Sequence, residues 1–154
     1  MSYIQCSITT GATDDAQAIA AFQIAMARET ENYALDPETV QKGVERMLAM
    51  PDRGFYVVAK NICNTLISSL LVLKEWSDWR NTDVWWVHSL YVEPKHRRQG
   101  VFRHMMAYVE ERARDNGVAG IRLYVERENH DAKAVYAALG MSNDHYELYE
   151  KMLH

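Results

Sequence analysis

The stretch between Tyr91 and His104 limits the folds open to this chain more than any other feature. A run rich in Trp, Val and Tyr, residues 84–92, is followed by Pro94, a basic loop, Gly100 and an amphipathic repeat. Such a run is typical of a β-strand, and the repeat is typical of an α-helix. A strand, a glycine-containing loop and a helix bring successive backbone N–H groups and a helix N-terminus to one place, which suits phosphate oxygens. The first question is therefore which phosphate-bearing molecule this loop holds.

The rest of the composition narrows the class of protein. At 154 residues the chain predicts a single domain over 1–154, large enough for a real core. A formal net charge of −4 argues against nucleic acid as a partner, and no apolar run is long enough to span a bilayer. The first residues lack the pattern of a signal peptide. Cys6 and Cys63 lack metal-ligand spacing, which indicates reduced core cysteines of a cytoplasmic protein.

The order of predicted elements indicates the fold class. Helices are expected after Thr13 or Asp14, from Asp36–Pro37, after the basic loop until Asn116–Gly117, and around Ala132 until Gly140. Strands are expected over 3–9, 55–59, 65–76, 84–92 and 121–126, with one or two more before Leu153. This order predicts an α+β domain with a mostly antiparallel sheet and one β-α-β crossover.

The loop itself forms the first motif, Arg97-x-x-Gly100-x-Phe102. Without a Cβ, Gly100 lets the backbone come close to a ligand. The side chains of Arg97, Arg98 and Arg103 would add positive potential around a diphosphate. Arg-x-x-Gly is a common sequence, however, and a solvated surface loop explains this motif alone equally well.

The second motif follows the strand at 121–126 and contains Asn129, Ala132, Tyr136 and Gly140. On a helix, Ala132 and Tyr136 share a face, where a small residue admits an extended ligand and a phenol can deliver a proton. Taken alone, a purely structural explanation is favoured: Asn129 caps the helix, Ala132 and Tyr136 belong to the core, and Gly140 ends the helix.

At this spacing the two motifs together resemble the GNAT superfamily of acyl-CoA-dependent N-acetyltransferases. The resemblance implies a GNAT-like mixed, mostly antiparallel central sheet with helices on both faces, whose crossover carries the acyl-CoA site. It also implies acetyl-CoA as the acyl-donor co-substrate, without a metal. One departure is Phe102, where the family usually has Gly or Ala. The resemblance assigns contacts with coenzyme A to Leu90, Tyr91, Val92, Arg97, Arg98, Gln99, Gly100, Val101, Phe102, Arg103, Asn129, Ala132 and Tyr136.

The implied reaction is direct transfer of an acetyl group to a primary amine, with Tyr136 beside the thioester sulfur as the catalytic residue. The acceptor is a small-molecule or peptide amine, and the resemblance also allows a homodimer. Candidate residues on the acceptor side are Glu29, Glu31, Trp79 and His88, each of which also has an ordinary structural explanation. A non-catalytic acyl-CoA sensor of the same fold is the alternative. A nucleotide-binding P-loop is excluded because its Gly-x-x-x-x-Gly-Lys-Ser/Thr motif does not occur.

Overall fold

A single mixed sheet organises the computed structural model, which describes residues 5–154. Its strands lie in chain order: β1 (Cys6–Thr10), β2 (Gly54–Asn61), β3 (Leu66–Ser77), β4 (Thr82–Val92) and β5 (Ile121–Arg122). Neighbours from β1 to β4 pair antiparallel, and β4 pairs with β5 in parallel. The predicted mostly antiparallel sheet with one β-α-β crossover is therefore confirmed.

Helices begin where the sequence predicts them. The helices are α1 (Ala16–Glu31, after the 3₁₀ turn Thr13–Asp15), α2 (Pro37–Leu48), α3 (Val101–Asp115) and α4 (His130–Ala138). At the start of α2, the Asp36 carboxylate accepts a hydrogen bond from the Thr39 N–H at 2.9 Å. Gly117 and Gly140 have positive φ angles of 67° and 82° just after α3 and α4, as expected of glycines that end helices.

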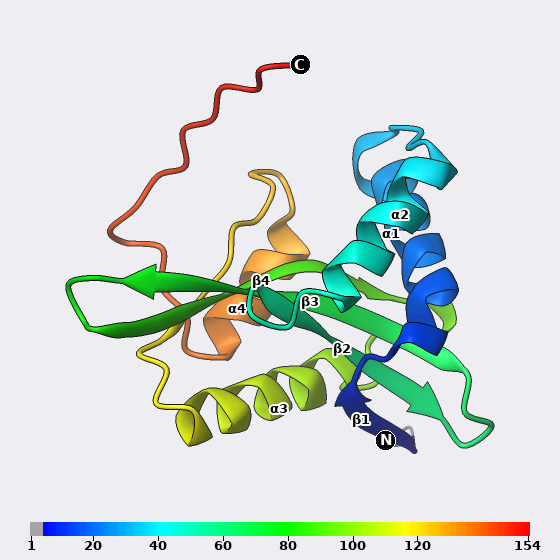
Figure 1. The fold of residues 1–154 in the computed structure, drawn as a ribbon, viewed down its shortest axis with the longest axis horizontal. Coiled ribbons are helices and arrows are strands. Elements are labelled where there is room, and N and C mark those ends of the chain that lie inside the picture. The colour runs from blue at the N-terminus through cyan, green and yellow to red at the C-terminus, as the bar shows by residue number, and fades with distance from the viewer. Residues whose placement is uncertain (1–4) are drawn as a thin grey trace. The chain divides into compact units, whose positions relative to one another are not determined.

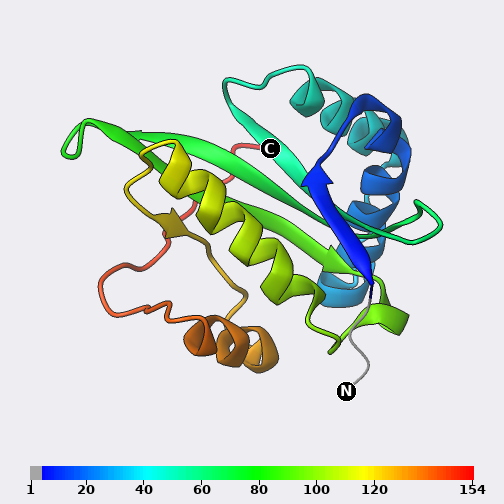
Figure 2. The same cartoon turned by 90° about the horizontal axis from the view of Figure 1, so that it is seen from below.

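The helices of the first 122 residues cover both faces of the sheet, as Figures 1 and 2 show. Helices α1 and α2 pack on one face, where Ile19, Phe22 and Val44 join Tyr56 and Val58 of β2. The buried stripe of α3 lies on the other face and consists of Val101, Met105, Met106, Val109 and Ala113. Phe102, in the first turn of α3, is half-buried.

The adjacent residues Trp85 and Trp86 show how β4 separates these two faces. Trp85 is buried and meets the Phe55 ring edge-on at 5.1 Å, and Arg112 of α3 lies over that same ring. Trp86 is opposite Leu73, which packs against the core below α1 and α2. The alternation of side chains along a strand therefore places the two indoles on opposite faces.

The described chain divides into two compact units, Met1–Arg122 and Leu123–His154. The second unit contains α4 and shows where strand prediction was wrong. The strand predicted over 121–126 ends at Arg122, and residues 141–154 contain no strand. The large apolar residues from Tyr146 onward are exposed, with Tyr146 at 74% and Tyr149 at 88%. Alternation predicts which side chains share a face, but a strand also needs a neighbouring strand to bond with.

The two cysteines do not lie where the sequence predicts them. Cys63 is exposed in the turn after β2, and Cys6 is half-buried, so the prediction that both are core cysteines was wrong. Cys63 lies two residues after the polar Asn61, whose side-chain oxygen accepts a hydrogen bond from the Cys63 N–H, so the turn holds Cys63 outside the sheet.

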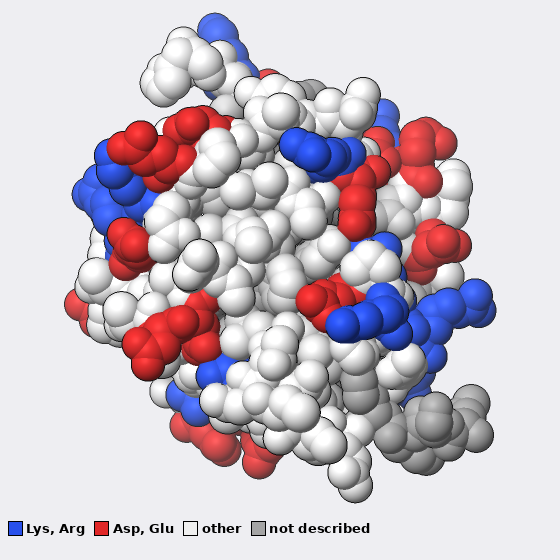
Figure 3. Space-filling model, turned by 90° about the vertical axis from the view of Figure 1, so that its right-hand side faces the viewer, with Lys and Arg blue, Asp and Glu red and all other residues white. Residues whose placement is uncertain are grey.

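On the face in Figure 3, basic side chains are intermixed with acidic ones. No helix among residues 5–154 has both the length and the apolar character needed to cross a bilayer.

Candidate active site

The second half of β4 is irregular in a way that exposes its backbone. Between Leu71↔His88 and Ser69↔Tyr91, β4 contains one residue more than β3, and Ser89 at this bulge has a φ of 54°. On the other side, β5 pairs with β4 only at Trp85 and Trp86. Beyond that point β4 has β3 as its neighbouring strand but no longer β5. Residues 90–92 therefore present a strand edge to which an extended ligand can pair.

The loop after β4 turns backbone N–H groups toward one region. It contains the 3₁₀ turn η2 (Pro94–His96), after which Arg98 and Gly100 adopt left-handed φ angles of 62° and 81°. No side chain caps the N-terminus of α3, and the first intrahelical bond runs from the His104 N–H to the Gly100 carbonyl at 3.1 Å. The first turn of a helix carries N–H groups without intrahelical acceptors and a partial positive charge. A Cβ built on Gly100 would meet nothing within 4 Å, so the space beside it is open to a ligand.

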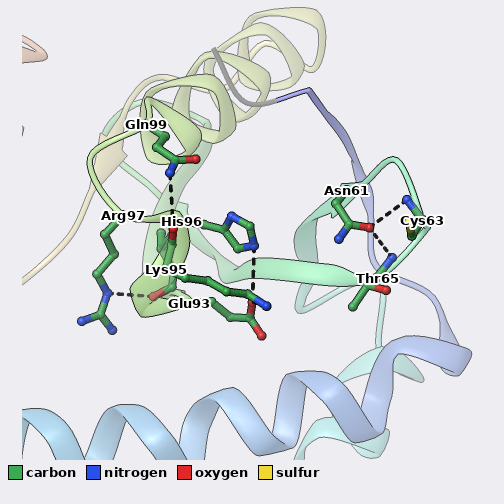
Figure 4. Close-up of polar contacts among 9 residues, drawn as sticks. Asn61, Cys63, Thr65, Glu93, Lys95, His96, Arg97 and Gln99 are labelled. Carbon is green, nitrogen blue, oxygen red and sulfur yellow. Dashed lines mark hydrogen bonds and ion pairs between the residues drawn. The ribbon is translucent and has the colours of Figure 1, made fainter. Parts of the chain in front are cut away.

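The predicted arginines of the loop have different roles in the structure. Arg97, Arg98 and Arg103 are all exposed, but the Arg97 guanidinium also bonds to other groups of the protein. Its Nε donates to the Val92 carbonyl at 2.8 Å, and its Nη2 donates to Glu29 at 2.7 Å. Figure 4 shows the hydrogen bond from Arg97 to the Val92 carbonyl. It also shows the Gln99 amide donating to the Lys95 carbonyl and the His96 ring beside Glu93. Val101 is buried and Phe102 is half-buried at the start of α3.

Glu29 connects this loop to α1 and to β4. One carboxylate oxygen of Glu29 pairs with Arg97, and the other accepts a hydrogen bond from the Tyr91 hydroxyl at 2.9 Å. The Arg97 guanidinium lies 5.3 Å from the centre of the Tyr91 ring. The hydrogen bond from Arg97 is the main reason why the pKa of Glu29 lies below its usual value. Burial raises the pKa of Tyr91, which is 6% exposed, and the Glu29 carboxylate raises it further. Glu31 is exposed at the end of α1.

A shallow groove of about 420 Å³ lies between α1 and the start of the loop. It is lined by Ala21, Phe22, Ala25, Tyr91, Glu93, Pro94 and Lys95. Its floor includes Phe22 and Tyr91, whose rings are 5.1 Å apart.

Two of the predicted acceptor-side residues lie on β4 or the turn before it. His88 is half-buried, and burial lowers its pKa below the usual histidine value, so the ring is neutral and able to accept a proton near pH 7. Trp86 is stacked beside His88, and its indole N–H donates to Glu75, which also pairs with Arg122 at 3.1 Å. Trp79 is 86% exposed in the β3–β4 turn, so it walls no pocket within the first unit.

The second unit positions the remaining predicted residues. The Asn129 side-chain oxygen accepts the Ala132 N–H at 3.1 Å, which makes Asn129 the N-cap of α4 and leaves its NH₂ group to donate elsewhere. Tyr136 is half-buried one turn after Ala132. Burial raises the pKa of the Tyr136 phenol, which keeps it protonated as a hydrogen-bond donor.

Sequence reasoning did not find the hydrogen-bonded group of Glu29, Tyr91 and Arg97, nor the bulge at Ser89. Glu29 lies more than 60 positions before Tyr91 and Arg97, so no local spacing reveals their contact. At the bulge, the left-handed residue is a serine, which gives no signal comparable to a glycine.

Comparison with known proteins agrees with this geometry. The family model described as Acetyltransferase (GNAT) family matches residues 18–141. A search of curated proteins gives no match. A possible acetyltransferase from Clostridium difficile 630 is similar, with 35% identity, a TM-score of 0.89, and coverage of 97% of this chain and 98% of that one.

Two more distant structures share the fold. A predicted acetyltransferase from Clostridium acetobutylicum, solved with acetyl-CoA, has 14% identity, a TM-score of 0.77 and 97% coverage of each chain. A ribosomal-protein-alanine N-acetyltransferase from Brucella melitensis biovar Abortus 2308 has 14% identity and a TM-score of 0.79, covering 97% of this chain and 100% of that one. The family model and the relative with 35% identity lead to one conclusion: this chain is an acyltransferase of the acetyltransferase (GNAT) family.

Proposed function

We propose that this protein transfers the acetyl group of acetyl-CoA to a primary amine by direct attack on the thioester. The observation that carries the proposal is the loop after β4, where left-handed Arg98 and Gly100 precede an uncapped helix N-terminus. This arrangement provides backbone N–H groups for a diphosphate, and the open space beside Gly100 fits the close approach of such a ligand. The solved relative from Clostridium acetobutylicum, described with acetyl-CoA, supports the same choice of donor.

The residues of the first unit would hold the donor at two places. The main chain of Arg98, Gln99, Gly100, Val101, Phe102 and Arg103 would surround the diphosphate. Leu90, Tyr91 and Val92, at the open edge of β4, would pair with the pantetheine arm like an added strand. Phe102, half-buried at the start of α3, would narrow the loop but leave donation by its backbone N–H groups intact.

The residues of α4 would serve the other end of the arm. The Asn129 amide and the small Ala132 would face the pantetheine, with Tyr136 beside the sulfur. The neutral amine attacks the carbonyl carbon, a C–N bond forms and the C–S bond breaks. Coenzyme A leaves as a thiolate that the Tyr136 phenol would stabilise by donating a hydrogen bond or a proton, while a base accepts the proton that the amine loses. His88, neutral near pH 7, is our candidate for that base.

Two measurements test the proposal in sequence. Calorimetry with coenzyme A should show binding, and absence of binding would overturn the proposal. Release of free thiol from acetyl-CoA should then depend on the amine supplied, over a panel of polyamines, amino acids and peptides with free N-termini. Binding of coenzyme A without thiol release from any amine would instead favour the sensor.

A further inference from the structure

We propose that Glu29 is a positioning residue for the phosphate-binding loop and that it acts through Arg97, whose guanidinium holds the loop rather than the diphosphate. This inference rests on the proposed function, because it concerns the same loop. It differs from the assignment made by resemblance, in which Arg97 contacts coenzyme A directly.

The contacts of Arg97 leave its guanidinium on the α1 side of the loop. One nitrogen donates to the Val92 carbonyl at the end of β4, and another forms the 2.7 Å ion pair with Glu29. The face of the guanidinium lies over the Tyr91 ring. A diphosphate would have to compete with a carboxylate that is already in place.

Glu29 is suited to this task because both of its oxygens are used. One accepts from Arg97 and the other accepts from Tyr91, so a single carboxylate joins α1, β4 and the loop. Tyr91 is itself fixed by the Phe22 ring of α1. A glutamine at position 29 would keep one acceptor oxygen but lose the charge and the second acceptor.

The position of Arg97 explains how this contact reaches the ligand. Arg97 directly precedes Arg98, whose φ of 62° is a conformation that a non-glycine residue keeps only where its surroundings hold it. Gly100, also left-handed, follows two residues later. Anchoring Arg97 at Val92 and Glu29 therefore fixes the start of the segment whose N–H groups form the anion site.

A double-mutant cycle separates positioning from direct contact. We expect Glu29→Gln and Arg97→Gln each to weaken binding of coenzyme A by about tenfold, within the range for residues of one hydrogen-bond network. If Glu29 acts through Arg97, the double variant should bind coenzyme A no more weakly than Arg97→Gln alone. If the two losses of affinity for coenzyme A instead multiply in the double variant, Arg97 contacts the diphosphate independently of Glu29, and the inference is overturned.

Kinetics provide a readout that general damage to the fold would not give. In Glu29→Gln the KM for acetyl-CoA should rise about tenfold while kcat at saturating donor stays within about twofold. The matched control is Glu38→Gln, the same substitution in the exposed Glu38–Lys42 pair of α2, which should change neither value. Equal or tighter binding by Glu29→Gln would refute the proposed role.

Two further results keep the outcome unambiguous. If Glu29→Gln does not fold, Tyr91→Phe removes only one hydrogen bond from the same carboxylate and should raise the KM for acetyl-CoA in the same direction. An unchanged KM in that variant would then count against the inference. Failure of the unmodified protein to bind coenzyme A would overturn the proposed function itself, whereas normal binding with unaffected variants would overturn only the role of Glu29.

Discussion

Trp86 and His88 lie side by side on one face of β4, with ring centroids 6.2 Å apart and ring planes inclined by only 19°. Their separation by two residues places both on the face opposite α3. The indole is held from its far side, because Trp86 donates to Glu75. His88 is thus a half-buried imidazole, and this burial lowers its pKa below the usual histidine value.

The lowered pKa of His88 predicts a pH dependence of stability. The unfolded chain takes up a proton at this residue near pH 6.5, whereas the folded protein does so only at lower pH. Its contribution to stability is therefore fully present above about pH 6.5 and is lost as the pH falls toward the folded pKa. Urea midpoints measured between pH 5.5 and 7.5 should fall on the acid side, and His88→Gln should flatten this fall.

The exposed His145 provides the matched control for that measurement, because His145→Gln should leave the acid-side fall unchanged. An identical pH dependence in His88→Gln and the unmodified protein would show that burial of this ring does not control the effect.

Glycine-to-alanine substitutions at positions 100 and 43 should have opposite effects on stability. A Cβ meets nothing within 4 Å at either position, so crowding cannot distinguish them. Gly100 has a φ of 81°, a conformation that alanine adopts less readily, so Gly100→Ala should lower the free energy of unfolding by about 1 kcal/mol. Gly43 lies inside α2, where alanine should stabilise the helix by about 0.5–1 kcal/mol. Urea unfolding of both variants checks the signs, and destabilisation by Gly43→Ala would contradict the prediction.

The sequence predicted those features that depend on local patterns. Asp36–Pro37 predicts the start of α2, and the residue types from Pro94 to Gly100 predict the loop after β4. Each of these depends on neighbours within a few positions. Local pattern therefore predicted the main helices and the loop between β4 and α3.

Features that depend on tertiary contact were not predicted. The sequence offers Glu29 as an acceptor-side residue or an ordinary surface carboxylate, whereas in the structure its two oxygens accept hydrogen bonds from Arg97 and Tyr91. The early end of β5 at Arg122 likewise depends on how far the neighbouring strand stays close, which periodicity does not encode.

Replacement of Tyr136 by Phe tests the proposed proton donor. Burial raises the pKa of this phenol, so it should remain protonated through the working pH range and donate to the departing thiolate. We expect at least a tenfold loss of turnover, in line with general acid catalysis, with little change in the affinity for coenzyme A. Turnover and calorimetric affinity should be measured on the same preparation. Unchanged turnover would remove Tyr136 from the mechanism.

Salt should weaken the binding of coenzyme A, and Arg98 should account for part of that dependence. Arg98 is exposed in the loop, and its charge is available to a diphosphate within the screening length of about 10 Å at 0.1 M salt. Arg98→Gln should reduce affinity by about tenfold, as expected for a hydrogen bond to a charged group, and should make the salt dependence shallower. Arg114→Gln is the matched control, because Arg114 pairs with Glu110 at the opposite end of α3 and should leave both quantities unchanged. Equal salt slopes for Arg98→Gln and the unmodified protein would mean that the backbone N–H groups bind the diphosphate without help from this side chain.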